Sequence, residues 1–252
     1  MLKEINLPKK IIVKDLKNNH YQVTMEAFYP GYGATIGNSL RRVLLSSLPG
    51  SAVTSFKVEN AQHEFDTIDG IKEDMVEIML NLKSLRLKVF STEPVKLKLE
   101  VKGEKVVKAK DIKKDSEVEI ISKDLIIATI TDKSVKLSME IIVEQGLGYE
   151  ATEQRENQKL EIGTISIDSS FSPVLNVGYK IENVRVGKMT NYEKLILDII
   201  TDGTMDVEEA INKASFILKD HFNLLIKKEK PKKEKPKKEK PKKEKPKKEK
   251  KK

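Results

Sequence analysis

The chain has 252 residues with 48 Lys and Arg against 39 Asp and Glu, a formal net charge of +9. Residues 227–252 carry 17 Lys and 5 Glu, so the first 226 residues have a net charge of −3, which argues against a basic nucleic-acid-binding body. The chain has no Cys and only three His, far apart, which excludes disulfides and thiolate metal sites and argues against a His-rich one. There is no apolar run of membrane-spanning length and no apolar signal core, so we expect a cytoplasmic protein without a cofactor.

The first 50 residues predict two strands and a helix. Apolar alternation places strands at 11–16 and 21–25, with Asn18-Asn19 as the turn between them. Glycines cluster before a helix expected at 36–48, with Thr35 as its N-cap and Pro49-Gly50 as its stop. One face of this helix carries the apolar residues Ile36, Leu40, Val43, Leu44 and Leu48.

The glycine cluster at 31–37 has the spacing Gly-x-Gly-x-x-x-Gly, which fits neither the dinucleotide fingerprint nor the Walker A loop. We interpret it as a turn that feeds the helix, with Gly37 allowing another element to approach closely. Arg41 and Arg42 point about 100° apart on the helix, so at least one lies near the edge of the apolar face. That arginine is either a solvated flank or an interface residue.

Residues 52–143 predict a mostly β region. A strand at 52–58 is followed by a loop and by an amphipathic helix at 71–82. Apolar residues then alternate with charged ones, mostly Lys, at 85–89 and 95–101, and the apolar alternation returns at 135–141. This period of two indicates an antiparallel sheet with lysine-rich outer faces.

Acidic residues gather near His63 in the loop that ends at Gly70. Glu64, Asp66 and Asp69 follow it, and Glu73 and Asp74 are expected in the first turn of the next helix, where carboxylates suit the helix dipole. A metal or acid–base site is conceivable there. However, the chain shows no Ser/His/Asp or Cys/His arrangement and no close Asp triplet for two magnesium ions. An independent enzyme that uses this loop is therefore a weak alternative.

Strands at 162–168, 177–186 and 194–200 precede a last helix, which begins at Asp206 with a spacing to Glu209 that imitates a capping box. Its wide apolar stripe is buried either within this chain or against a second copy, and His221 on it is expected to be packed. The stripe consists of Val207, Ala210, Ile211, Ala214, Ile217, Leu218, Leu224 and Leu225. After Ile226, Lys-Lys-Glu-Lys-Pro repeats without apolar residues predict a disordered tail at 227–252.

Six segments in order along the chain resemble a known family. Residues 31–50, Gly-Tyr-Gly-Ala-Thr-Ile-Gly-Asn-Ser-Leu-Arg-Arg-Val-Leu-Leu-Ser-Ser-Leu-Pro-Gly, resemble the signature of the bacterial RNA polymerase alpha subunits, in their N-terminal assembly domain. His-Glu-Phe-Asp-Thr at 63–67 is similar to that family too. The other matching segments are 80–83, 171–174, 179–187 and 198–203.

The resemblance implies an α+β fold with two subdomains. One is a dimerisation subdomain made of residues 1–50 and 174–226, and the other is an inserted, mostly antiparallel β subdomain at 51–173. The implied function is a non-catalytic subunit that homodimerises and then assembles the β and β′ subunits of a polymerase that copies DNA into RNA. The two apolar helices would form the dimer seam, with Ile36, Leu40, Val43, Leu44, Leu48, Ile211, Ala214, Ile217, Leu218 and Leu225 in it.

The resemblance also implies contacts with the large subunits. Arg42 matches the assembly-critical second arginine of the Leu-Arg-Arg motif, and His63, Glu64, Phe65, Asp66 and Thr67 look like a loop that contacts the β subunit. Family members usually continue into a small DNA-binding domain, where this chain has only its Lys/Glu/Pro tail. Promoter and activator recognition therefore cannot be carried over, and weak, sequence-independent DNA contact through the tail is expected at most. The rival interpretation is a stand-alone nucleic-acid-binding protein that acts through this tail.

Overall fold

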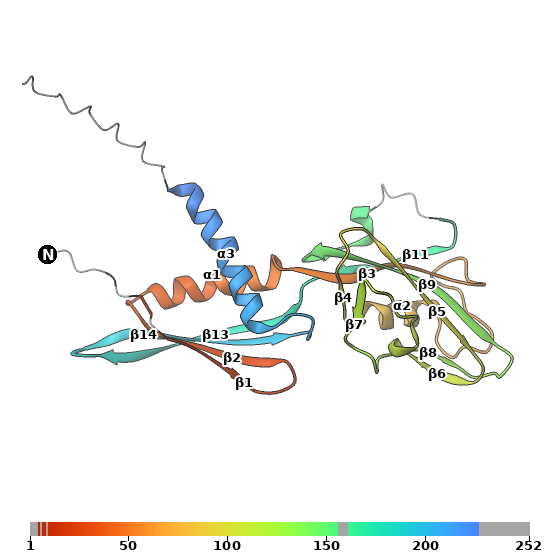
Figure 1. Ribbon diagram of the computed structural model, residues 1–252, viewed down its shortest axis with the longest axis horizontal. Coiled ribbons are helices and arrows are strands. Elements are labelled where there is room, and N and C mark those ends of the chain that lie inside the picture. The colour runs from red at the N-terminus through yellow and green to blue at the C-terminus, as the bar shows by residue number, and fades with distance from the viewer. Residues whose placement is uncertain (1–4, 6, 9, 156–160, 227–252) are drawn as a thin grey trace, which may run out of the picture.

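The computed structural model describes residues 5, 7–8, 10–155 and 161–226, which form two lobes arranged end to end (Figure 1). We call residues 10–50 with 174–226 the terminal lobe and residues 51–173 the insert lobe. Strand β3 (Pro49–Val58) runs from the first into the second. Each lobe has its own cluster of buried apolar residues. The predicted α+β class is confirmed, whereas the tail at 227–252 lies outside the described residues.

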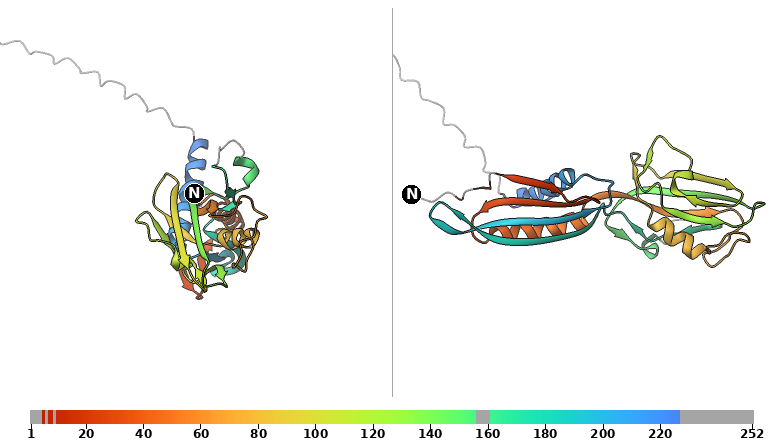
Figure 2. Two further views of the ribbon diagram at one scale, coloured as in Figure 1. Left: turned by 90° about the vertical axis from the view of Figure 1, so that its right-hand side faces the viewer. Right: turned by 90° about the horizontal axis from the view of Figure 1, so that it is seen from below.

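The terminal lobe is one antiparallel sheet that packs against α1 (Tyr32–Ser46) and α3 (Val207–Leu225). Helix α1 contacts the sheet and also α3, as the side views in Figure 2 show. Alternate residues along one central strand, Leu195, Leu197 and Ile199, are buried, as a sheet with one covered face requires. The strands, in the order in which they pair, are β1 (Ile11–Asp15), β2 (His20–Phe28), β14 (Met189–Thr201) and β13 (Val174–Val186).

Two local predictions in this lobe are confirmed. Asn18 and Asn19 have φ of 54° and 57° in the turn between β1 and β2, a conformation that Asn tolerates better than most residues. Gly37 brings α1 against the sheet, because a Cβ there would lie 2.8 Å from Leu195 Cδ1 and 3.1 Å from Tyr179 Cδ2. A side chain at position 37 would push the helix away from β13 and β14.

The insert lobe consists of antiparallel strands around a single α-helix, α2 (Met75–Lys83). Its main sheet has the order β11-β3-β9-β5, and three two-stranded pairs, β4 with β7, β6 with β8, and β10 with β12, complete it. The remaining elements are β4 (Leu87–Val89), β5 (Val95–Lys102), β6 (Lys105–Lys108), η1 (Ala109–Asp111), β7 (Val118–Ile120), β8 (Ile126–Ile130), β9 (Lys136–Leu147), β10 (Tyr149–Glu150), η2 (Thr152–Arg155), β11 (Thr164–Ser166) and β12 (Ser169–Ser170).

Strand β5 shows how the period of two builds this lobe. Leu97 and Leu99 are buried in the core, whereas Lys96 and Lys98 lie on the outer face. Both lysines pair with Glu140 of the neighbouring strand, at 3.2 Å and 3.6 Å. The predicted antiparallel sheet with lysines on its outer face is therefore confirmed.

The expected start of the first helix was wrong. Helix α1 begins at Tyr32, with Gly31 as its N-cap residue in the left-handed region at φ 88°. Thr35 is already inside the helix, and its hydroxyl donates to the Gly31 carbonyl at 3.2 Å. The missing cap is supplied by β14: the two carboxylate oxygens of Glu193 accept from the Gly31 and Gly33 amides, each at 2.8 Å. A carboxylate also suits the positive end of the helix dipole.

Helix α2 also begins later than expected, whereas α3 begins where the sequence placed it. Helix α2 begins at Met75 rather than at 71, because Asp74 caps it by accepting from the Glu77 amide at 2.6 Å. Glu73 therefore precedes the helix, and its carboxylate accepts from the amide of Thr129 on β8 at 2.6 Å. Asp206 is the N-cap residue of α3, but its side chain makes no capping hydrogen bond, so the capping box is absent.

Candidate protein-interaction surfaces

The apolar face of α1 is used mainly within this chain. Leu40, Leu44 and Leu48 are buried in the terminal-lobe core, and Ile36 and Val43 are half-buried against the same cluster. These three leucines are therefore explained by burial within this chain and need no second copy to cover them.

Helix α3 differs between its two halves. Ala214 is buried, and Ile211, Ile217 and Leu218 are half-buried against the core. The end of the helix projects from the body of the lobe (Figure 1). The large apolar side chains there are exposed in the single chain, as are Phe216 near the middle of α3 and Ile226 just after it: Phe216 (61%), Phe222 (55%), Leu224 (84%), Leu225 (78%) and Ile226 (65%).

The exposed end of α3 is the most apolar helix surface that the chain leaves uncovered. His221, expected to be packed, is exposed there, and its Nδ1 lies 2.8 Å from the Ile217 carbonyl oxygen. Sequence reasoning identified the stripe but did not include Phe216 and Phe222. Phe222 lies three residues before Leu225 on the same side of the helix, so a wider angular window would have found it, whereas Phe216, nine residues before Leu225, lies on the opposite side.

Arg41 and Arg42 have different environments on α1. The Nε of Arg41 donates to the Val177 carbonyl on β13 at 3.0 Å, which ties the helix to the sheet. Arg42 is exposed, and among the described residues its side chain makes no hydrogen bond or ion pair. Both arginines are exposed, and of the two only Arg41 is tied to the sheet by a hydrogen bond.

The loop at 63–67 is shaped by one carboxylate. Asp66 accepts from the amides of Gln62 at 2.6 Å and His63 at 3.1 Å, and the His63 ring lies 2.9 Å from its other oxygen. These backbone hydrogen bonds hold the pKa of Asp66 below its ordinary value. Phe65 is 75% exposed at the tip, and Glu64 and Thr67 are exposed too. The loop thus presents an aromatic ring on a fixed backbone.

Of the acidic residues that follow His63, Asp66 contacts its ring, but Glu73 and Asp74 have partners on other elements. Glu73 binds Thr129 and Asp74 caps α2, so both have structural partners. Within the residues that the structure describes, no group of three His, Asp or Glu is placed to hold a metal ion. Across the same residues, no helix is both long and apolar enough to cross a membrane.

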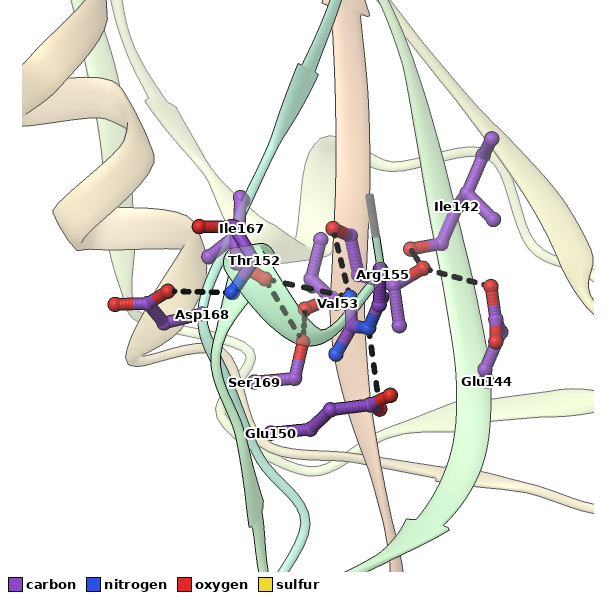
Figure 3. Close-up of polar contacts among 10 residues, drawn as sticks. Val53, Ile142, Glu144, Glu150, Thr152, Arg155, Ile167, Asp168 and Ser169 are labelled. Atoms are coloured by element: carbon purple, nitrogen blue, oxygen red, sulfur yellow. Dashed lines mark hydrogen bonds and ion pairs between the residues drawn. The ribbon is translucent and has the colours of Figure 1, made fainter. Parts of the chain in front are cut away.

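Figure 3 shows a polar network that sequence reasoning missed, around Arg155. The side chain of Arg155 is 8% exposed, and its Nε lies 3.1 Å from a Glu150 carboxylate oxygen. Its Nη1 donates to the carbonyls of Thr54 at 3.3 Å and Ile167 at 3.4 Å. Arg155 therefore fastens the 149–155 segment onto β3. No periodic pattern marks such a residue, because its partners come from distant parts of the chain.

Asp168 anchors the same segment from the other side (Figure 3). It accepts from the Thr152 amide at 3.0 Å and from the Tyr149 hydroxyl at 3.0 Å, and Lys83 lies 3.5 Å away. The Thr152 amide, foremost among these partners, lowers the pKa of Asp168. The side of the insert lobe next to the 63–67 loop is thus held by charged hydrogen bonds.

Comparison with known proteins agrees with this two-lobed arrangement. The family described as the RNA polymerase Rpb3/RpoA insert domain matches residues 56–172. A DNA-directed RNA polymerase subunit alpha of Oceanobacillus iheyensis is 46% identical over 224 residues, which cover 88% of this chain and 71% of that protein. The same subunit of Alkaliphilus oremlandii is 45% identical and that of Desulfitobacterium hafniense 47%, both over 88% of this chain and over 70% and 71% of the relatives.

These findings first define a class: an α+β protein whose inserted β lobe is that of an RNA polymerase subunit. The similarity over 88% of the chain then gives the family. The chain belongs to the DNA-directed RNA polymerase alpha subunits. The expected family membership is thereby confirmed. It favours a polymerase subunit over the two alternatives, an independent enzyme and a stand-alone nucleic-acid-binding protein.

Proposed function

We propose that this chain is the alpha subunit of a DNA-directed RNA polymerase, that it forms a homodimer, and that the dimer holds the β and β′ subunits together. Family membership supports the first part. The observation that carries the dimer is the end of α3, where Phe222, Leu224 and Leu225 are exposed on one helix. Exposed apolar side chains in such a cluster mark protein interfaces.

The proposed seam is narrower than the ten residues expected from the sequence. Leu40, Leu44, Leu48 and Ala214 support α1 and α3 from inside the lobe. The side chains offered to a second chain are those at the end of α3, together with the half-buried Ile36, Val43, Ile217 and Leu218. A two-fold axis would bring the same patch of both chains together.

The dimer is tested with Phe222→Glu combined with Leu225→Glu in the full chain. Both residues lie on one side of α3, three positions apart, and both are exposed, so the charges should leave the fold of the single chain intact. Light scattering coupled to size-exclusion chromatography should give twice the chain mass of 28.6 kDa for the parent and once that mass for the variant.

Asn212→Glu provides the matched control, because it adds a charge at an exposed polar position in the first half of α3 and should stay dimeric. Circular dichroism should show the same helix content in all three proteins. A parent chain that is monomeric at assembly concentrations, or a double variant that remains dimeric, would contradict this seam.

For the large subunits, we propose Arg42 and residues 63–67 as contacts. Arg42→Ala should weaken capture of the β subunit by about 2 kcal/mol, the common cost of truncating a desolvated interface arginine, and should leave the dimer intact. Arg41→Ala should lower thermal stability, since it removes the hydrogen bond to Val177, but should capture β normally once folded. A titrated pull-down compares the three proteins, and equal β capture by Arg42→Ala would return that residue to the solvated flank.

Phe65→Ser tests the loop in the same titration. Its ring is exposed, so the variant should fold normally and bind the large subunits more weakly. We propose no catalytic residue in this chain; its contribution is surface. Weak DNA contact through residues 227–252 stays a prediction, because these residues lie outside the described part of the structure.

A further inference from the structure

The insert lobe carries a pocket that the assembly role leaves unused. It has a volume of about 390 Å³ and lies beside the paired strands β4 and β7. It is lined by apolar side chains, among them Phe90 and Ile120, and by four lysines, Lys110, Lys113, Lys114 and Lys123. A pocket lined by both apolar side chains and lysines suits a ligand that combines an apolar group with negative charge.

Phe90 is the aromatic wall of this pocket and is 57% exposed. It follows directly after β4, where Leu87 and Val89 point into the core, so the alternation of the strand turns Phe90 outward. Its amide donates to the Glu117 carbonyl at 2.9 Å, which fixes the backbone from which the ring projects. The Nζ of Lys88 lies 5.6 Å from the ring centroid. The ring therefore contributes to a surface that the lobe core does not need.

The lysines around the pocket are largely available for another molecule. Lys113 pairs with Glu100 at 2.7 Å. Lys110, Lys114 and Lys123 are exposed and make no ion pair with any residue in the described ranges. Four lysines against two acids, Asp115 and Glu119, leave the lining of the pocket positively charged, so a negatively charged group is attracted to it.

We propose that this pocket binds an acidic segment of a partner protein, with one bulky apolar side chain of that segment against Phe90 and its carboxylates among the lysines. A nucleic acid fits less well, because it carries a charge at every phosphate and some of these would face Asp115 and Glu119, whereas a peptide can place its carboxylates beside the lysines alone. The tail of this chain does not fit either, because its 17 Lys against 5 Glu make it positively charged, like the lysines that line the pocket. Charge complementarity therefore selects an acidic peptide with an aromatic anchor.

The test uses the full chain and a synthetic peptide in which glutamates and aspartates flank a single benzoylphenylalanine, a photo-cross-linking analogue of phenylalanine. After illumination, mass spectrometry should find cross-links at Phe90 and within residues 110–123. A second, fluorescein-labelled peptide with phenylalanine at that position measures affinity. Phe90→Ser should weaken binding of this peptide about tenfold, the effect of losing a well-packed aromatic contact.

Charge is tested with the triple variant Lys110→Glu, Lys114→Glu and Lys123→Glu, which should abolish the cross-links at the pocket. The matched control Lys133→Glu changes an exposed lysine of the same lobe that does not line the pocket, and it should bind as the parent does. Circular dichroism and thermal unfolding verify that each variant is folded. A peptide with serine in place of phenylalanine measures the purely electrostatic background, including that of the lysine-rich tail.

Three results would overturn the proposal. Cross-links confined to residues 227–252 would mean that the tail alone attracts the peptide. Equal affinity of the parent and Phe90→Ser would remove the aromatic anchor. Displacement of the peptide by a short single-stranded RNA that itself loses affinity in Phe90→Ser and in the triple lysine variant would assign the pocket to nucleic acid.

Discussion

The two lobes bury their apolar residues to different degrees. In the insert lobe, four antiparallel sheets and α2 enclose a large cluster that runs from Val53 to Ile167 along the chain. In the terminal lobe, one sheet is covered on one face by α1 and by the start of α3, and none of the described residues covers the end of α3. The terminal lobe therefore exposes Phe222, Leu224 and Leu225 together on a projecting helix, whereas the insert lobe has a closed core and exposes apolar side chains such as Phe65 and Phe90 outside it.

This difference explains why the two lobes suit different tasks. A closed lobe can present loops and pockets, such as the 63–67 loop and the pocket at Phe90, without losing its fold when it is free. In the proposed dimer the second chain covers the end of α3 and stabilises the terminal lobe, so the folding and the association of this lobe would be coupled. Variants that change one lobe at a time separate the two experimentally.

The largest effect is expected from a charge in either core. Leu44 in the terminal lobe and Leu99 in the insert lobe are fully buried. Leu44→Glu and Leu99→Glu should each cost about 4 kcal/mol or more, because each buries a carboxylate without a partner. Hydrogen exchange should rise mainly in the lobe that carries the change. An increase of similar size in both lobes would show that they unfold as one cooperative unit. Ala34→Glu is the control, because Ala34 is exposed on α1.

A smaller effect is expected at the junction between the lobes. A Cβ at Gly50, at the start of β3, would lie 1.8 Å from the Phe171 carbonyl oxygen, so the backbone has to move. Gly50→Ala should lower the free energy of unfolding by about 1–3 kcal/mol, as overpacking does. In Gly178→Ala the nearest atom, Asp198 Cβ, is 3.9 Å away, so thermal unfolding should hardly change. Equal unfolding temperatures for both variants would mean that the junction is loosely packed.

The cap of α1 should matter less. Glu193→Ala removes the carboxylate that accepts from the Gly31 and Gly33 amides and should destabilise the terminal lobe by about 1 kcal/mol, the usual worth of a helix cap. Glu26→Ala removes an exposed acid from β2 of the same lobe and should be nearly neutral in urea unfolding. If Glu26→Ala cost as much as Glu193→Ala, the loss would reflect net charge rather than the cap.

The smallest effect is a local dependence on pH in the insert lobe. The pKa of Asp66 is lowered from its ordinary value of 3.8 by the Gln62 and His63 amides. The hydrogen bonds of the carboxylate are therefore complete above this ordinary value and are lost as the pH falls through the lower value of the folded protein. Amide chemical shifts of residues 62 and 63 should move in that acidic range. Asp66→Asn should remove the transition, and an unchanged transition in Asp66→Asn would assign it to another group.

Local patterns predicted the elements better than their ends. The alternation at 95–101 gave β5 and its outer lysines, and the turn at Asn18-Asn19 is where the sequence placed it. Helix starts were missed because the deciding groups are far away in sequence. The Glu193 carboxylate caps the start of α1, and the Glu73 carboxylate binds the Thr129 amide instead of joining α2. Neither contact can be recognised from the neighbouring residues in the sequence.

The candidate surfaces show the same limit. The resemblance pointed to Arg42, but the residues themselves could not tell which of the two adjacent, exposed arginines is hydrogen-bonded to the sheet. That depended on Val177 of β13, whose carbonyl accepts from the Arg41 side chain. The lysine-rimmed pocket was not foreseen either, because its lysines and Phe90 come together only where β4, β5, β7 and the segment after η1 meet.

By itself, the sequence determined the α+β class, the family, and the presence of an apolar stripe too wide for a solvated helix, because composition, period and collinear motifs are properties of the chain. Which apolar side chains of these helices are buried in the core of the terminal lobe could be seen only in the tertiary structure. Leu44 and Leu225 are both leucines on helical faces, yet one is fully buried and the other is 78% exposed. Periodicity measures how apolar a face is, whereas burial depends on whether another element lies in front of it, and the end of α3 projects away from the sheet (Figure 1).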